Sequence, residues 1–217
     1  MTGIPYDDLA GARAATAALL AHLDAVDPAE LLPPSRLPGW SRAHVVAHLA
    51  GNADSHVRML DGCLAGEVRS QYEGGREARE AAIDALAADP AIAIAEHRRA
   101  CADLDERWQR MAAEDWQRDV LRLDRGPEPA LGLAWARWRE VEMHRVDLGL
   151  GHEPTDWQPA FAERLLAELL DRTGLRADVA ARVRGPAHEL AAWLSGRSDG
   201  SGLQVLYGDL PVPPPWS

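Results

Sequence analysis

The sequence predicts a mostly α-helical protein, in which a four-helix bundle is followed by a small α+β domain. The 217 residues are 47% hydrophobic, but alanine supplies much of that share, and there are eight tryptophans and one phenylalanine. This alanine-rich composition favours helices over strands. Long segments before residue 150 repeat their apolar residues with a helical period, whereas shorter helix-like and strand-like segments alternate after it.

Four segments of the first 150 residues have the pattern of long helices. Asp7 and Asp8 suit the first turn of the first helix, and Ser41 is the expected N-cap of the second. The dipeptide Asp89-Pro90 should bend or break the third. The predicted helices cover residues 6–25, 42–65, 77–112 and 130–149, with a long glycine-rich connection at 66–76 and a loop or short strand at 113–128.

The segment G-L-G-H-E-P-T-D-W, rich in glycine and proline, marks a domain boundary. We therefore assign residues 1–150 to the bundle and residues 151–217 to the α+β domain. The second domain should contain a helix at 158–172, a short strand in A-A-R-V-R-G, a helix in P-A-H-E-L-A-A-W-L and an edge strand in L-Q-V-L-Y-G-D-L.

The formal net charge of −11 argues against nucleic acid and anionic membranes as partners. A small anionic molecule remains possible if arginines converge locally. We find neither a signal-peptide pattern nor about 18 uninterrupted apolar residues, and we expect a cytoplasmic protein that is a monomer or a weak homo-oligomer. Cys63 and Cys101 are the only cysteines and form no C-x-x-C motif, so we interpret them as core thiols in a reducing compartment.

Glu140 and His144 are candidate metal ligands. They stand four residues apart in W-A-R-W-R-E-V-E-M-H-R-V-D, so a helix places them on one face, one turn apart. Such a pair can also be a surface contact with no metal. Glu142 is the rival carboxylate, but it lies on a different side of the helix from His144. Asp147, three residues beyond His144, could orient the imidazole as a hydrogen-bond acceptor, or could face solvent.

A catalytic zinc site has three protein ligands and an open position, so a third ligand is needed from another helix. The segment G-W-S-R-A-H-V-V-A-H-L-A-G-N-A-D-S-H offers three histidines. His44 is the third helical residue after Ser41, where exposure or a capping role is expected. His48 is one turn deeper and is the best interior residue, whereas His56 should lie near the far end of the helix.

Three motifs together resemble the mycothiol-dependent maleylpyruvate isomerases, whose N-terminal domain is a DinB-like metal-binding four-helix bundle. These motifs are L-P-G-W-S-R-A-H-V-V-A-H-L-A-G-N-A-D, R-W-R-E-V-E-M-H-R-V-D-L-G and R-G-P-A-H-E-L-A-A-W-L-S-G-R. The resemblance covers essentially the whole chain. It implies a divalent metal, usually zinc, that is held by His48, Glu140 and His144, the residues that helix geometry favours.

Three arginines and one asparagine are candidates for binding the substrate and the thiol cosubstrate, and one of the arginines is implied by the resemblance. Arg197 matches the arginine that closes the late motif and is the first candidate for a substrate carboxylate; alternatively, it caps the end of a helix. Arg76 and Arg79, in or just beyond the long loop, could bind an anion or face water. With Asn52 they are the candidates for binding mycothiol. Asp147 and Arg197 are the expected catalytic residues besides the metal ligands.

The implied reaction is a cis-trans isomerisation. The sulfur of mycothiol, activated by the metal, would add to the cis double bond of maleylpyruvate, and its expulsion after rotation would leave fumarylpyruvate. The alternatives are a mycothiol S-transferase with the same thiol activation, or a metal- or ligand-binding bundle without catalysis.

Overall fold

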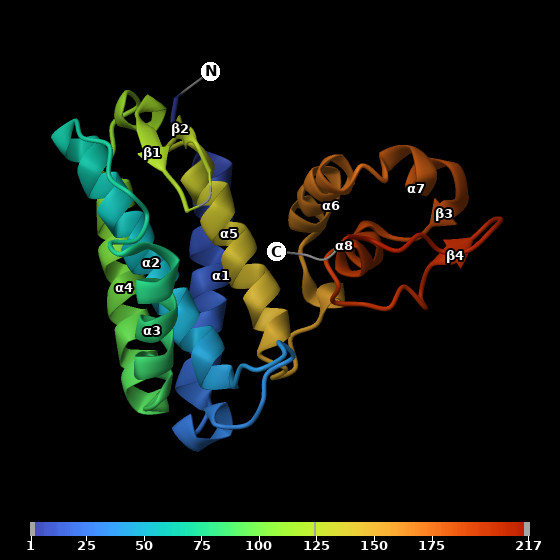
Figure 1. The fold of residues 1–217 in the computed structure, drawn as a ribbon, viewed down its shortest axis with the longest axis horizontal. Helices are drawn as coiled ribbons and strands as arrows, with labels where there is room; N and C mark the ends of the chain where they lie inside the picture. The colour runs from blue at the N-terminus through green and yellow to red at the C-terminus, as the bar shows by residue number, and fades with distance from the viewer. Residues whose placement is uncertain (1–2, 124, 215–217) are drawn as a thin grey trace. The chain divides into compact units, whose positions relative to one another are not determined.

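The computed structural model describes residues 3–123 and 125–214, and its fold is mostly α, as the sequence predicts (Figure 1). The chain divides into two compact units, Met1–Gly149 and Leu150–Ser217. Within the described residues, every helix is too short or too polar to cross a membrane.

The first unit is built on four long helices that pack side by side (Figure 1). They are α1 (Tyr6–Ala25), α2 (Arg42–Ala65), α4 (Pro90–Arg110) and α5 (Gly132–Asp147). α2 contacts α4 and α5, and α1 contacts α5 and α4, which closes the bundle. The predicted helices at 6–25 and 42–65 are confirmed. The helix predicted at 130–149 is shorter at both ends.

The segment predicted as one helix with a break forms two helices, α3 (Gly75–Ala87) and α4. Asp89 separates the two helices. Its side chain accepts hydrogen bonds from the backbone N–H groups of Ala91 (3.0 Å) and Ile92 (3.2 Å) and so caps α4. Pro90 occupies the first helical position, where a missing N–H is tolerated. α3 packs on the outside of α2 and α4.

Apolar side chains of the four helices form the core of this unit. Met59, Leu60, Leu104 and Leu133 are all at most 2% exposed. α1 and α5 approach closely at Gly11, where a Cβ atom would lie 2.4 Å from the indole of Trp138.

Short elements complete the first unit. A 3-10 turn, η1 (Pro28–Leu31), precedes α2. A second, η2 (Asp115–Gln117), precedes a hairpin of β1 (Asp119–Leu121) and β2 (Pro127–Pro129). The strands are antiparallel, with Val120 opposite Glu128. Ser70, in the long connection after α2, forms a bridge to Leu121 and anchors that loop to the hairpin.

The second unit contains η3 (Pro154–Asp156), α6 (Pro159–Thr173), α7 (Arg176–Arg182), β3 (Val183–Arg184), α8 (Ala187–Leu194) and β4 (Gln204–Val205). α6 packs against α8, and Trp157 and Phe161 meet edge to face, with ring centroids 5.5 Å apart.

Two predicted strands of the second unit are corrected. Only the end of A-A-R-V-R-G is extended, because its first residues finish α7, a helix that the sequence analysis missed. In L-Q-V-L-Y-G-D-L only Gln204 and Val205 pair with β3. Gly208, with φ of +68°, turns the chain away from an extended path.

Candidate metal centre and adjoining pocket

The start of α2 is fixed by a capping box, and this determines which histidines face the interior. The Ser41 side chain accepts from the backbone N–H of His44 (3.4 Å), and Nδ1 of His44 accepts from the backbone N–H of Ser41 (3.3 Å). His44 therefore has the capping role that its position suggested. One turn further on, His48 is buried at 6% exposure.

Arg42 sets the register between α2 and α5. Its Nε donates to the carbonyl oxygen of Leu148 (3.0 Å), and its Nη2 donates to that of Gly149 (3.3 Å). These carbonyl groups follow the end of α5 and have no partner within a helix. The contact holds the beginning of α2 against the end of α5, and so brings His48 opposite Glu140 and His144.

The three predicted ligands meet in one cluster. Oε2 of Glu140 lies 3.1 Å from Nε2 of His48 and 3.4 Å from Nε2 of His144. The two imidazole rings are 4.7 Å apart at 82°. One ligand atom from each residue lies within 4.8 Å of the others, and this is the one such cluster found within residues 3–123 and 125–214. Two imidazole nitrogens and a carboxylate form a donor set typical of catalytic zinc.

The electrostatics of the cluster favour an ion pair between Glu140 and His144 beside a neutral His48. Burial alone would raise the pKa of Glu140, but the hydrogen bonds from His144 and His48 hold it well below its ordinary value. Burial lowers the pKa of His48 to about 4. Burial also acts to lower the pKa of His144, but the hydrogen bonds to Asp147 and Glu140 raise it above the usual value. A metal ion that binds here therefore replaces the proton of His144.

Asp147 orients His144. Its side chain is 2% exposed, and its Oδ2 accepts from Nδ1 of His144 at 2.9 Å. Of the two interpretations of Asp147, the structure therefore favours the hydrogen-bond acceptor over the solvent-facing residue. Because Nδ1 carries its proton toward Asp147, Nε2 is directed to Glu140 and is the nitrogen available to a metal.

Arg79 contacts the other histidine of the cluster. Its Nη2 lies 2.9 Å from Nδ1 of His48, and its guanidinium lies 5.7 Å from the centre of the Tyr72 ring. Since arginine can only donate, Nδ1 of His48 accepts, and Nε2 carries the proton that Glu140 accepts. A metal on Nε2 would require the proton to move to Nδ1, which would break the contact with Arg79. The donor set thus fits a divalent ion, with Arg79 as a competitor.

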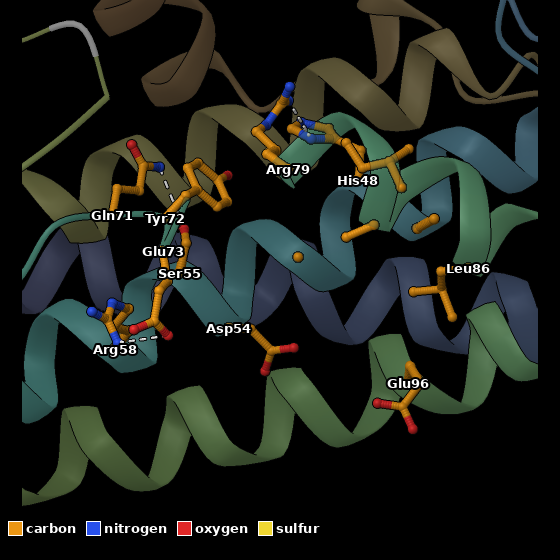
Figure 2. A pocket seen from close by; sticks show the side chains of 14 residues that line it. His48, Asp54, Ser55, Arg58, Gln71, Tyr72, Glu73, Arg79, Leu86 and Glu96 are labelled. Carbon is orange, nitrogen blue, oxygen red and sulfur yellow. Dashed lines mark hydrogen bonds and ion pairs between the residues drawn. The ribbon is translucent and has the colours of Figure 1, made fainter. Parts of the chain in front are cut away.

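A pocket of about 300 Å³ opens beside the cluster, between α2, α3, α4 and the loop after α2 (Figure 2). His48 and Arg79 lie next to each other in its lining, and polar side chains of α2 and the loop line it as well (Figure 2). Gln71 holds the loop after α2 in place, because its Oε1 accepts from the backbone N–H of Leu123 (2.9 Å) and its Nε2 donates to the hydroxyl of Ser55 (3.4 Å). The other lining residues that can hydrogen bond are Asp54, Ser55, Arg58, Gln71, Tyr72, Glu73 and Glu96.

Other predicted residues lie outside this group. Glu142 is buried and accepts from Arg145 (3.2 Å), so it is not a rival ligand. His56 is not near the end of α2 but buried at 1% exposure in its second half. Asn52 does not line the pocket; its Oδ1 accepts from Arg137 (2.8 Å).

Arg76 and Arg197 are placed as follows. Arg76 is exposed on α3, and the pocket is lined by Arg79 instead. Arg197 follows α8, where its backbone N–H donates to Ala192 (2.8 Å) and its Nη1 donates to the carbonyl of Ser195 (2.9 Å). Its role with the substrate stays a prediction. The sequence analysis missed Gln71 and Tyr72, for which the only signal was the length of the loop that carries them.

Comparisons with known proteins connect this geometry to a family. Residues 12–149 match the family model described as the mycothiol maleylpyruvate isomerase N-terminal domain. A crystal structure of the mycothiol-dependent maleylpyruvate isomerase is similar, with a TM-score of 0.88 and 26% identity, over 98% of this chain and 97% of that chain. A histidine-to-alanine mutant of that isomerase is also similar, with a TM-score of 0.86 and the same identity and coverage. The comparison with curated proteins gave no match. The chain belongs to the mycothiol-dependent maleylpyruvate isomerase family.

Proposed function

We propose that this protein isomerises maleylpyruvate to fumarylpyruvate with mycothiol as cosubstrate. The observation that carries the proposal is the cluster of His48, Glu140 and His144, of which His48 also lines the adjoining pocket. The cluster would hold one divalent ion, most simply zinc, and such an ion lowers the pKa of a thiol so that it reacts as a thiolate.

Residues of the chain would prepare this chemistry. Asp147 fixes the tautomer of His144, and Glu140 supplies a negative charge that partly offsets that of a divalent ion. Mycothiol is a cysteine conjugate whose remaining part is rich in hydroxyl groups. The carboxylates and amide of the pocket are groups that bind hydroxyls, and Tyr72 offers a face against which a sugar ring can pack. These features support the pocket as the mycothiol site.

In the proposed reaction the sulfur adds to one carbon of the cis double bond, and the electron pair moves onto the conjugated carbonyl. Rotation about the new single bond and expulsion of the sulfur give the trans isomer, so the thiol is not consumed. The enolate and the two carboxylates of the substrate need cationic or N–H donors. Arg79 and Arg197 are the arginines that we propose for this work.

The test is a turnover assay of the zinc-loaded protein with mycothiol and maleylpyruvate. We expect loss of maleylpyruvate and formation of fumarylpyruvate that require mycothiol, while the concentration of free thiol stays constant. Stoichiometric loss of thiol would indicate an S-transferase instead. Absence of any reaction in folded, zinc-loaded protein would indicate a binding protein.

A further inference from the structure

A second cavity of about 400 Å³ opens to solvent between α1, α4 and α5. It shares none of its lining residues with the pocket beside His48. Leu20 of α1 and Leu104 and Trp108 of α4 supply apolar walls. The volume is within the range of about 300–1,000 Å³ that is usual for small-molecule sites.

Arg137 of α5 lies at the buried end of this cavity and is 0% exposed. Its Nη1 donates to the carbonyl of Leu49 (2.9 Å) and to Oδ1 of Asn52 (2.8 Å), and its Nη2 donates to Sγ of Cys101 (3.3 Å). Its Nε has no hydrogen-bond partner. The hydrogen bonds of this guanidinium thus go to an amide, a carbonyl and a sulfur, and within the described residues no carboxylate pairs with it. A buried charge is usually paired, because removing it from water is costly.

Two buried histidines that feel the charge of Arg137 do not neutralise it. His56 and His97 have their pKa values lowered to about 3, first by burial and next by the charge of Arg137, so both are neutral. Arg13 and Arg98 also line the cavity, and each is paired with a carboxylate: Arg13 with Asp105 at 2.5 Å, and Arg98 with an aspartate of α1. Three arginines and one aspartate therefore face the cavity, in a chain whose net charge is −11.

We propose that this cavity is a second ligand site, which binds a small carboxylate with an apolar body. The apolar walls would contact the body of the ligand, and the carboxylate would offset the buried charge of Arg137. An inorganic anion would leave the apolar walls unused, and a neutral molecule would leave the guanidinium unpaired. This site does not depend on the proposed isomerase reaction, because it uses neither the metal ligands nor the pocket beside them.

The test measures binding of benzoate to the full-length, zinc-loaded protein by isothermal titration calorimetry, with benzamide as a neutral ligand of the same shape. We expect benzamide to bind at least tenfold more weakly than benzoate. Equal binding of the two, or no binding of benzoate at millimolar concentration, would overturn the proposal.

Two variants of α4 locate the site. Ala102 is exposed and lines the cavity, so Ala102→Trp should fill it and weaken benzoate binding at least tenfold. Ala95 is also exposed on the same helix but does not line the cavity, and Ala95→Trp should bind benzoate within twofold of the wild type. Benzoate that binds Ala102→Trp as well as the wild type, as it would when bound to the zinc ion, would overturn the assignment. If the Arg137→Met variant folds, it should not bind benzoate. If it does not fold, the two tryptophan variants still decide the test.

Discussion

Replacing Asp147 should weaken zinc binding without removing a ligand. Its Oδ2 accepts from Nδ1 of His144 at 2.9 Å, in a side chain that is only 2% exposed. A hydrogen bond to a charged partner contributes about 1.5–3 kcal/mol, and about 1.4 kcal/mol corresponds to a factor of ten in affinity. Asp147→Ala should therefore lower the zinc affinity about tenfold to a hundredfold, the range typical for residues that orient a ligand. Asp147→Asn keeps an acceptor and should lose less.

The pH dependence of this loss has a definite sign. In the metal-free protein, Asp147 also helps to hold the pKa of His144 above its ordinary value, against the effect of burial. Zinc must displace that proton, so removing Asp147 also reduces competition from protons. The affinity deficit of Asp147→Ala should be largest at pH values above the pKa of His144. It should shrink as the pH falls through that pKa, since the wild type then loses zinc affinity faster than the variant.

The assay is competition for zinc with a chromogenic chelator at about pH 6 and about pH 8.5, on either side of the usual histidine pKa. Glu142→Gln is the matched control, because Glu142 is a buried acid of the same helix that accepts from Arg145 and is not one of the three clustered ligands. It should bind zinc as the wild type does. Zinc affinity of Asp147→Ala within twofold of the wild type at both pH values would refute the role of Asp147, as would a deficit that grows toward acid pH.

Four further predictions follow from the site. His144→Ala should lose most of its bound zinc in elemental analysis while its helical circular dichroism persists; full occupancy would remove His144 from the ligand set. Arg79→Met should bind zinc at least as tightly as the wild type, because a donor that competes at His48 and a nearby positive charge are lost, but its KM for maleylpyruvate should rise. The double variant Cys63→Ala, Cys101→Ala should keep thiol-dependent turnover, since the attacking sulfur belongs to the cosubstrate, and a folded but inactive double variant would indicate an enzyme-borne nucleophile. Arg197→Ala should lower kcat/KM about tenfold or more with unchanged zinc content, as the loss of a charge-assisted contact of about 1.5–3 kcal/mol requires; wild-type kinetics would leave it as a residue at a helix end.

The sequence by itself determined the features that depend on neighbouring residues. Glu140 and His144 lie one above the other because helical geometry alone places residues four apart on one face. Ser41 marked the beginning of α2, and Asp89-Pro90 marked a bend or break where the structure begins α4, since capping is local chemistry. With the start of α2 fixed, His48 could be recognised as an interior residue.

Only the tertiary structure decided which groups from distant segments meet. The contact of Arg79 with His48 spans 31 residues, and the burial of Arg137 against Asn52 spans 85. The helical period of apolar residues predicts that an arginine faces solvent, so it could not indicate a guanidinium inside the bundle. The protonation of Glu140 and His144 was likewise beyond the sequence, because it depends on burial and on hydrogen bonds across two helices. Sequence spacing determines the face on which a side chain lies, and packing determines the charges that it faces there.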